Sequence, residues 1–405
     1  MISVEEAQRR ILSRVTSPLA SEMVPLTQGL GRVLSSDISS DIDIPPFTNT
    51  SMDGYAVIAQ DTGSASPDNP VRLPVVATIA AGHPVSTPLG SGACMRIMTG
   101  APLPPAADAV VQVEWTRPDP ANASFVLIER PVESGQNIRR QGDDMKRNTV
   151  VLTAGTPLTP PVIGILATVG CDPVPVYRRP RVVIVSTGDE LIELGQPLRP
   201  GTIRNSNSLA MAAAVRAAGG LPNILPRAHD SLPDILARLD QAAETGDVII
   251  TSGGVSVGDF DLVKTALADH GTLDFWQVNM KPGKPVTFGA YRQRPFVGLP
   301  GNPVSALVTF ELFVRPILRI LQGDNAWRRR HLTLPLGRRF DEVTDRRHYV
   351  RCRLIDRQGD VVIEPHLNQG SAIQTSWADV EALMIVPEFT GPYEPGTLMP
   401  IMLIG

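Results

Sequence analysis

The sequence contains few of the residues that usually build a disulfide framework or a zinc site. Only 3 cysteines and 6 histidines occur in 405 residues. Cys94, Cys171 and Cys352 lie far apart, and no pair of cysteines or histidines has the short spacing of a zinc site. We therefore expect reduced thiols in a cytoplasmic protein, without disulfides or a preformed zinc centre.

Long apolar runs and strongly basic segments are also missing. No stretch approaches the roughly 18 apolar residues that span a bilayer. Residues 1–15 carry acids and no apolar core, so we expect no signal peptide. The net charge is −4, and Arg328, Arg329 and Arg330 form the only run of basic residues that stands out. A nucleic-acid partner is therefore not expected.

Proline, in contrast, is abundant, with 38 of 405 residues. It predicts short strands and fixed turns, because it ends helices and is confined to edge strands. Residues 30–175 show this pattern of short apolar runs between turns and are predicted to be β-rich. The chain is predicted to open with an amphipathic helix, since Ser3 and Glu6 form a capping-box pattern ahead of apolar residues at helical spacing.

From Arg181 onward, apolar strands alternate with helical segments, which predicts a parallel sheet covered by helices on both faces. From about residue 327 the pattern returns to short strands. In one of them, Val350, Cys352 and Leu354 alternate with Tyr349, Arg351 and Arg353. The fold class is therefore multidomain α/β plus β: a doubly wound α/β domain, a β-rich N-terminal half and a C-terminal β domain.

Candidate ligand-binding residues follow the predicted strands, where ligands bind in parallel sheets. After the strand DVII, the turn contains Ser252, Gly253, Gly254 and Ser256. Glycine amides and serine hydroxyls at such a turn are suited to an oxyanion. An ordinary glycine turn that caps the next helix is the alternative reading.

Acidic residues end other predicted strands. Asp189 and Glu190 follow one strand, Asp230 follows a second, and Asp261 lies beyond the glycine turn. If these carboxylates converge they repel one another without a cation, which predicts a metal site, and Asp261 beside the glycine turn suits Mg²⁺. Solvated acids or helix caps are the alternative.

Two further segments supply positive potential. Prolines fix Lys281 and Lys284 in the KPGKP loop, which predicts a local anion site. Asn302 and Ser305 lie at the start of a predicted helix, whose dipole favours an anion. A solvated loop and simple helix capping are the alternatives. Together the segments predict a pocket for a phosphorylated ligand, an oxyanion and a divalent cation.

Eight motifs carry a resemblance to a known family. They occur in this order: NTSMDGYAV, RIMTGAPLP, GQNIRRQGDD, STGDEL, TSGGVSVGDFD, KPGKP, GLPGNPVS and NQGS. In them the sequence resembles the molybdopterin molybdenumtransferase family (MoeA and the E domain of gephyrin). The resemblance implies a homodimer of four-domain chains. Its expected domains are a discontinuous domain of residues 1–48 and 141–178, a β-rich domain of 49–140, a molybdopterin-binding α/β domain of 179–326 and a C-terminal β-barrel of 327–405.

The resemblance also implies a reaction: Mg²⁺-dependent insertion of molybdate into adenylylated molybdopterin, which releases AMP and forms the molybdenum cofactor. The catalytic positions it implies are Asp53, Thr99, Asp144, Glu190 and Asp261. The first three are expected to act on the site of the partner subunit. Asp230 and Asp261 are the expected Mg²⁺ ligands. The molybdate and pocket positions it implies are Ser256, Lys281, Lys284, Pro285, Ser305, Arg351 and Ser371.

The sequence departs from the family pattern at two places. Asn205 stands where the family usually has Asp, and residues 376–379 read Ser-Trp-Ala-Asp instead of the usual Ser-Leu-Ala pattern. No hydrolytic nucleophile is evident, and metal-bound water is one option. Molybdopterin adenylyltransferase activity, a non-catalytic scaffold of the same fold and a preference for tungstate are the alternatives. Other molybdenum-cofactor enzymes are the expected protein partners.

Overall fold

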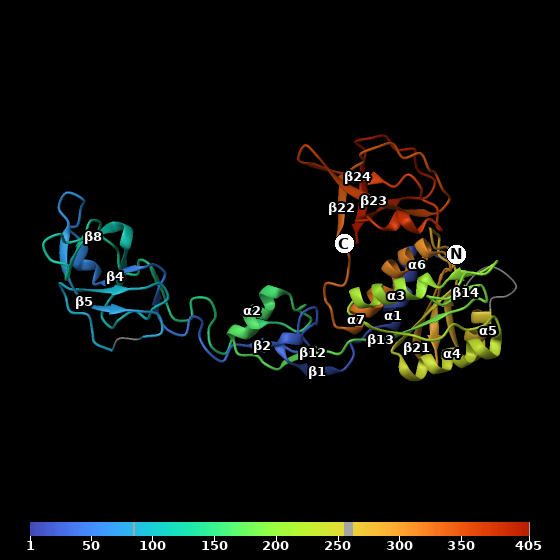
Figure 1. Cartoon of the computed structure of the whole chain (residues 1–405), viewed down its shortest axis with the longest axis horizontal. Helices are drawn as coiled ribbons and strands as arrows, with labels where there is room; N and C mark the ends of the chain where they lie inside the picture. Colours follow the sequence, from blue (N-terminus) through green and yellow to red (C-terminus); the bar gives the residue numbers. More distant parts are fainter. Residues whose placement is uncertain (84–85, 255–261, 405) are drawn as a thin grey trace. The chain divides into compact units, whose positions relative to one another are not determined.

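The computed structural model describes residues 1–83, 86–254 and 262–404. The chain forms two compact units, each built from separate segments (Figure 1). The first unit comprises Met1–Ser36, Ala154–Gly164 and Asp172–Gly405, and the second comprises Asp37–Thr153 and Ile165–Cys171. The finer division into four domains remains a prediction. Within the described residues, no helix has the length and apolar character needed to cross a membrane.

The second unit is β-rich, as predicted. Its main sheet has the strand order β7-β4-β6-β5-β9-β8. The bounds are β4 Gly54–Val57, β5 Val71–Ile79, β6 Cys94–Ile97, β7 Ala109–Gln112, β8 Thr116–Pro118 and β9 Phe125–Ile128. Two short pairs join distant segments: β2 (Ile38–Ser39) with β11 (Val150–Leu152), and β3 (Asn49–Thr50) with β10 (Ile138–Arg139).

The first unit opens with the predicted amphipathic helix. Helix α1 spans Val4–Arg14, and Ser3 caps it by accepting a hydrogen bond from the amide of Glu6 at 3.2 Å. A short antiparallel pair follows, formed by β1 (Ser21–Val24) and β12 (Val174–Tyr177). The boundary between the two units falls within helix α2 (Pro160–Thr168), because a segment of the first unit ends at Gly164 and one of the second begins at Ile165.

A six-stranded sheet forms the centre of the first unit, in the order β16-β13-β17-β21-β20-β18. Its bounds are β13 Arg181–Ser186, β16 Leu221–Ile224, β17 Val248–Ser252, β18 Gly271–Phe275, β20 Thr287–Tyr291 and β21 Arg294–Leu299. The strands β16, β13, β17 and β21 are parallel, whereas β20 pairs antiparallel with both β21 and β18. The predicted parallel sheet is confirmed for these four strands. The sequence did not predict β20, which runs in the opposite direction because a tight hairpin connects it to β21.

Helices cover both faces of this sheet, and the side-chain alternation of the strands decides which helix covers which face. Val182 and Ile184 of β13 pack with α3 and α6, while Val183 and Val185 pack with α4 and α5. The bounds are α3 Ser206–Ala217, α4 Leu232–Thr245, α5 Leu262–His270, α6 Pro303–Thr309 and α7 Arg315–Leu321. A π-helical segment, Phe310–Val314, joins α6 to α7, so the long apolar helix predicted there exists.

The C-terminal strands form a second six-stranded sheet, in the order β19-β23-β25-β26-β22, with β24 also paired to β23. An isolated bridge between Leu336 and Ile363 connects the end of β22 back to β24, so the sheet curls into a small barrel. The bounds are β19 Met280–Lys281, β22 His331–Pro335, β23 Arg347–Arg357, β24 Asp360–Pro365, β25 Ala382–Val386 and β26 Leu398–Leu403. Val350 and Cys352 are fully buried in its core, as the alternation predicts.

Candidate functional site

A cavity of about 410 Å³ in the first unit gathers residues from four separate segments. They are the end of β19 with the loop after it, the start of α6, the segment before β23 and the loop before the short helix at Gln374–Trp377. Six predicted substrate-binding residues line the cavity: Lys281, Lys284, Pro285, Asn302, Ser305 and Ser371. The sequence placed these residues in one pocket, and the structure brings them together.

The loop that carries the two lysines requires glycine at its centre. Gly283 has a φ of 106°, and a Cβ there would lie 2.5 Å from Cγ2 of Thr309. The carbonyl of Lys284 accepts hydrogen bonds from the amides of Val278 and Val286. The close approach to Thr309 and the hydrogen bonds to the Lys284 carbonyl therefore fix the loop. Both lysines line the cavity.

The cavity is cationic. Lys281, Lys284 and Arg346 line it, together with the carboxylate of Glu342, which forms an ion pair with the ammonium group of Lys281. Burial lowers the pKa of Lys281, and the positive charge of Arg346 lowers it further. Sequence reasoning missed Arg346 and Glu342. In the sequence they stand out only because they lie a few positions before the strand that contains Arg351. Neither follows a strand of the α/β sheet, which is where binding residues were expected.

Hydrogen bonds link the start of α6 to the loop that carries Ser371. The side-chain amide of Asn302 donates to Oγ of Ser371 at 3.2 Å, and the amide of Val304 donates to the Ser371 carbonyl at 3.2 Å. Asn302 precedes α6 in extended conformation but makes no side-chain capping bond. The capping alternative for Asn302 was therefore wrong, because its side chain is engaged by Ser371.

Arg351 lies behind this loop and does not line the cavity. It is fully buried, and its Nη2 donates to the carbonyls of Asn368 at 3.0 Å and Gly370 at 3.3 Å. Among the described residues, Nε and Nη1 find no hydrogen-bond partner. Burial lowers the pKa of Arg351 to about 10. The guanidinium thus orders the backbone next to Ser371.

A buried histidine separates Arg351 from the lysine loop. His348 precedes it by three positions on β23 and is fully buried. Burial, with the charges of Lys281 and Arg351, lowers the pKa of His348 to about 3. The imidazole is therefore neutral at physiological pH and adds no charge behind the cavity.

The predicted glycine turn is present at the end of β17. Gly253 and Gly254 have φ values of 89° and 68°, and a Cβ on Gly253 would meet the Thr187 carbonyl at 3.0 Å. The Gly253 amide, however, donates to the Leu299 carbonyl at 3.1 Å. It is therefore not free for a ligand, which corrects part of the expected oxyanion cradle. Ser256 and Asp261 lie outside the described residues.

A residue that sequence reasoning missed fixes this turn. The side-chain amide of Asn207, on α3, donates to Oγ of Ser252 at 2.9 Å and to the carbonyl of Gly301 at 2.7 Å. It therefore ties the end of β17 to the turn before α6, where the cavity begins. Its signal was present in the sequence, since Asn207 lies in the IRNSNS segment that was noted only for Asn205.

Asn205 is well accommodated in place of the usual aspartate. It is buried, and its Nδ2 donates to Oγ of Ser186 at 3.0 Å. Its side-chain oxygen accepts a bond from the amide of Ser208 at 3.4 Å and so caps α3. A neutral amide that donates and accepts fits this position without a buried charge.

The predicted acids lie at the carboxyl ends of β13 and β16. A bridge between Thr187 and Ala228 joins the two strand ends, and the Asp230 carboxylate accepts a bond from the Asp189 amide at 3.3 Å. The Asp189 carboxylate forms hydrogen bonds with His229 and with Arg227. These bonds, that of His229 first, lower the pKa of Asp189. Glu190 and Asp230 are exposed.

No metal-holding group of three His, Cys, Asp or Glu residues occurs in the described part of the chain. The predicted Mg²⁺ pair cannot be formed from that part alone, because Asp261 lies outside it. The pair Asp230 and Asp261 therefore stays a prediction.

In the second unit, Asp53 and Thr99 form a direct contact. Oδ1 of Asp53 accepts bonds from the Thr99 amide at 2.6 Å and the Thr99 hydroxyl at 2.8 Å. These bonds, the amide first, lower the pKa of Asp53. Asp144 is exposed, and its amide donates to the Ile44 carbonyl at 2.9 Å. The unit thus presents a carboxylate that stays ionised to low pH.

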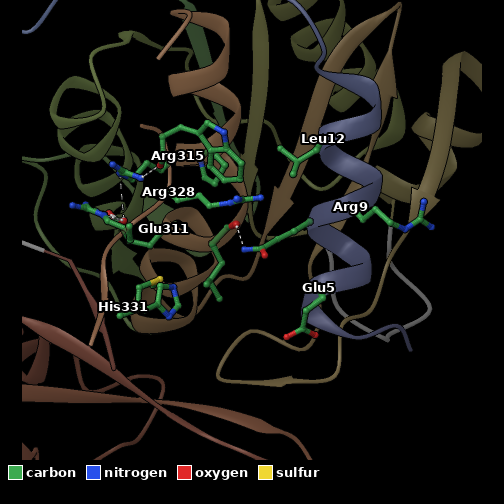
Figure 2. A pocket seen from close by; sticks show the side chains of 13 residues that line it. Glu5, Arg9, Leu12, Glu311, Arg315, Arg328 and His331 are labelled. Atoms are coloured by element: carbon green, nitrogen blue, oxygen red, sulfur yellow. Dashed lines mark hydrogen bonds and ion pairs between the residues drawn. The ribbon is translucent and has the colours of Figure 1, made fainter. Parts of the chain in front are cut away.

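A second cavity of about 420 Å³ lies between α1 and the segment around the π-helix (Figure 2). Glu5, Arg9 and Leu12 of α1 belong to its lining, together with Glu311 and Arg315 on the other side. In Figure 2 the side chain of Leu12 points toward Glu311 and Arg315, whereas that of Arg9 points away from them. Its lining includes none of the predicted catalytic or substrate-binding residues. Six of the predicted substrate-binding residues line the cavity around the lysine loop instead.

This arrangement defines a multidomain protein that carries a pocket lined by lysine and arginine beside an α/β sheet covered by helices. Comparison with known proteins gives the class. Residues 2–170 match the MoeA N-terminal region (domain I and II), 183–320 match a probable molybdopterin binding domain, and 333–404 match the MoeA C-terminal region (domain IV).

Relatives of known name match over the full chain. Molybdopterin molybdenumtransferase 2 of Mycobacterium tuberculosis is 40% identical, with 99% of each chain covered. The molybdopterin molybdenumtransferase of Bacillus subtilis is 38% identical, with 100% of this chain and 94% of the relative covered. A molybdopterin biosynthesis MoeA protein from Pyrococcus horikoshii has the same fold, with a TM-score of 0.86 at 28% identity and full coverage of both chains. The chain belongs to the molybdopterin molybdenumtransferase family, a family of transferases of molybdenum cofactor biosynthesis.

Proposed function

We propose that this protein inserts molybdate into adenylylated molybdopterin, with release of AMP. The observation that carries the proposal is the cationic cavity of the first unit, in a chain whose relatives are named molybdopterin molybdenumtransferase over their full length. Molybdate is a tetrahedral dianion. Lysine, arginine and hydroxyl donors are the groups that bind such an oxyanion.

The lysine loop is the proposed molybdate site. Lys281 and Lys284 supply charge, and Ser305 and Ser371 supply hydroxyl donors from the facing segments. Arg351 does not contact molybdate in this proposal. Its guanidinium donates hydrogen bonds to backbone carbonyls next to Ser371 and so positions that loop. The final ligands of the metal are the pterin sulfurs, so the protein needs no cysteine or histidine ligand.

The pterin nucleotide is proposed to lie at the carboxyl ends of β13, β17 and β21. This edge of a doubly wound sheet is where ligands bind. Ser252, Gly253 and Gly254 form a turn there that Asn207 links to the start of α6. A nucleotide on this turn would have its pterin end close to the lysine loop.

Magnesium is proposed to bind through Asp230 and Asp261. The exposed Asp230 carboxylate, close to the Asp189 amide, has the hard oxygen donors that Mg²⁺ prefers. When bound, the ion supplies charge neutralisation at the phosphates. Cleavage of the phosphoanhydride bond by water yields AMP and the phosphate of molybdopterin. The two dithiolene sulfurs of the pterin then bind molybdenum, while one oxygen ligand of molybdate takes up the two thiol protons and leaves as water.

The test is to incubate the purified protein with adenylylated molybdopterin, molybdate and Mg²⁺. We expect AMP release that depends on molybdate, and a product that activates a molybdenum-free apoenzyme. Lys284→Gln should lower this activity by about tenfold or more, because one charge-assisted bond to the oxyanion is lost. Arg330→Gln, an exposed arginine away from the cavity, is the matched control.

Three other outcomes would contradict the proposal. Consumption of ATP with free molybdopterin would identify an adenylyltransferase. No turnover with either substrate pair would favour a scaffold. AMP release with tungstate but not with molybdate would show that the metal substrate is tungstate, although the reaction would still be a metal insertion.

A further inference from the structure

A cluster of arginine residues lines another cavity, of about 600 Å³, that has no part in the proposed reaction. Its arginines are Arg32, Arg178, Arg179 and Arg181, and Glu22 is the one acid in its lining. Arg181 pairs with Leu221 where the parallel strands β13 and β16 begin. The cavity therefore lies at the amino ends of strands whose carboxyl ends carry the candidate functional site.

The carboxylates near this cavity do not balance its guanidinium groups. Asp247 accepts two bonds from Arg178, at 2.7 and 2.8 Å, and also lies 3.5 Å from Nε of Arg181. Glu22 forms an ion pair with Arg32. Two carboxylates thus face four guanidinium groups, which leaves two positive charges in excess.

Arg179 is the arginine without an acidic partner among the described residues. Its Nε is buried and has no hydrogen-bond acceptor in the described part of the chain. Burial and the nearby charge of Arg32 lower the pKa of Arg179. A buried donor without an acceptor is costly and uncommon in folded proteins. An anion in the cavity would offset the repulsion between these two arginines.

We infer that this cavity binds the phosphate group of a small phosphorylated molecule. The two excess positive charges match a phosphate dianion, and the planar guanidinium group suits two-point contact with its oxygens. The cavity falls within the usual size range of small-molecule sites and is larger than phosphate alone requires. Its described lining includes no aromatic ring to stack on a base, which favours a sugar or polyol phosphate over a nucleotide.

The inference is tested by calorimetric titration of the whole protein at low ionic strength, with glycerol 3-phosphate and inorganic phosphate as probes. Wild type should bind both, and the ester more tightly. Arg179→Gln should weaken binding by about tenfold or more, because one charge-assisted contact is lost. The charge-matched variant Arg330→Gln should bind as wild type does.

A second pair of measurements separates this cavity from the lysine cavity. Lys284→Gln should leave the binding of glycerol 3-phosphate intact, and Arg179→Gln should leave molybdate-dependent AMP release intact. Glycerol 3-phosphate should also raise the Tm of wild type but not that of Arg179→Gln. The inference fails if wild type shows no saturable binding. It also fails if Arg179→Gln binds as wild type does, or if only Lys284→Gln abolishes binding. Each result is independent of whether the insertion reaction is found.

Discussion

At the scale of single residues, Arg351 is the side chain whose environment departs furthest from its sequence pattern. The alternation along β23 places it opposite the core residues Val350 and Cys352, yet it is fully buried. The reason is that both faces of this part of β23 are covered, as the burial of Tyr349 against the α/β core also indicates. A guanidinium in such a place has to be compensated by hydrogen bonds.

The replacement Arg351→Ala should lower the free energy of unfolding by about 3 kcal/mol, because it leaves two carbonyls unpaired and opens a space in the interior. Molybdate affinity should fall with it, since the loop of Ser371 loses its support. Urea unfolding and molybdate titration measure the two effects. Arg353→Ala is the control on the same strand, where the half-exposed side chain should contribute less than about 1 kcal/mol. Equal losses in the two variants would contradict this account.

At the scale of elements, Asp247 joins the start of β17 to the segment that leads into β13. Its carboxylate accepts bonds from the Arg178 side chain at 2.7 Å and from the Arg181 amide at 2.8 Å. Burial alone would raise the pKa of Asp247, but these bonds outweigh burial and lower it to about 2. The connection between β12 and β13 therefore depends on an ionised carboxylate.

Because the pKa of Asp247 is lower in the folded state, its contribution to stability is complete above the unfolded pKa of 3.8 and is lost as the pH falls to about 2. The contribution should be about 2 kcal/mol. We expect Asp247→Asn to unfold more easily than wild type at pH 7, with a difference that shrinks between pH 4 and about 2. Urea unfolding at several pH values measures this difference. A difference that stays constant down to the lowest pH would contradict the assignment.

At the scale of the whole molecule, the chain divides its candidate residues between two compact units. Asp53 and Thr99 belong to the second unit, whereas the lysine loop belongs to the first. Family resemblance implies that the second unit of one subunit completes the site of its partner in a homodimer. Asp53 is thus proposed to act in trans, on the lysine cavity of the other chain.

Complementation between two inactive variants tests this arrangement. Asp53→Ala and Lys284→Ala should each lose most insertion activity as pure proteins. After co-expression, mixed dimers should contain one intact site each, so activity should recover to about a quarter of the wild-type level. Sedimentation should give twice the 43.5 kDa mass of the chain. If activity recovers neither after the two purified variants are mixed nor after they are co-expressed, Asp53 and Lys284 belong to the site of a single chain.

Local patterns were sufficient for much of the fold and for the composition of the site. The cap of α1, the strand–helix alternation after Arg181 and the lysine loop follow from residue spacing, because each depends on neighbours in the chain. The glycine turn at Gly253 was also predictable, since only glycine adopts its backbone conformation without strain.

The tertiary structure alone decided which of these groups are available for chemistry. It engages the Gly253 amide with Leu299, pairs Lys281 with Glu342 and places Arg351 behind its loop. It also reverses β20 and assembles the arginine cavity from residues far apart in the chain. Hydrogen-bond partners and burial depend on segments distant in sequence, and a pattern read along one segment does not contain them.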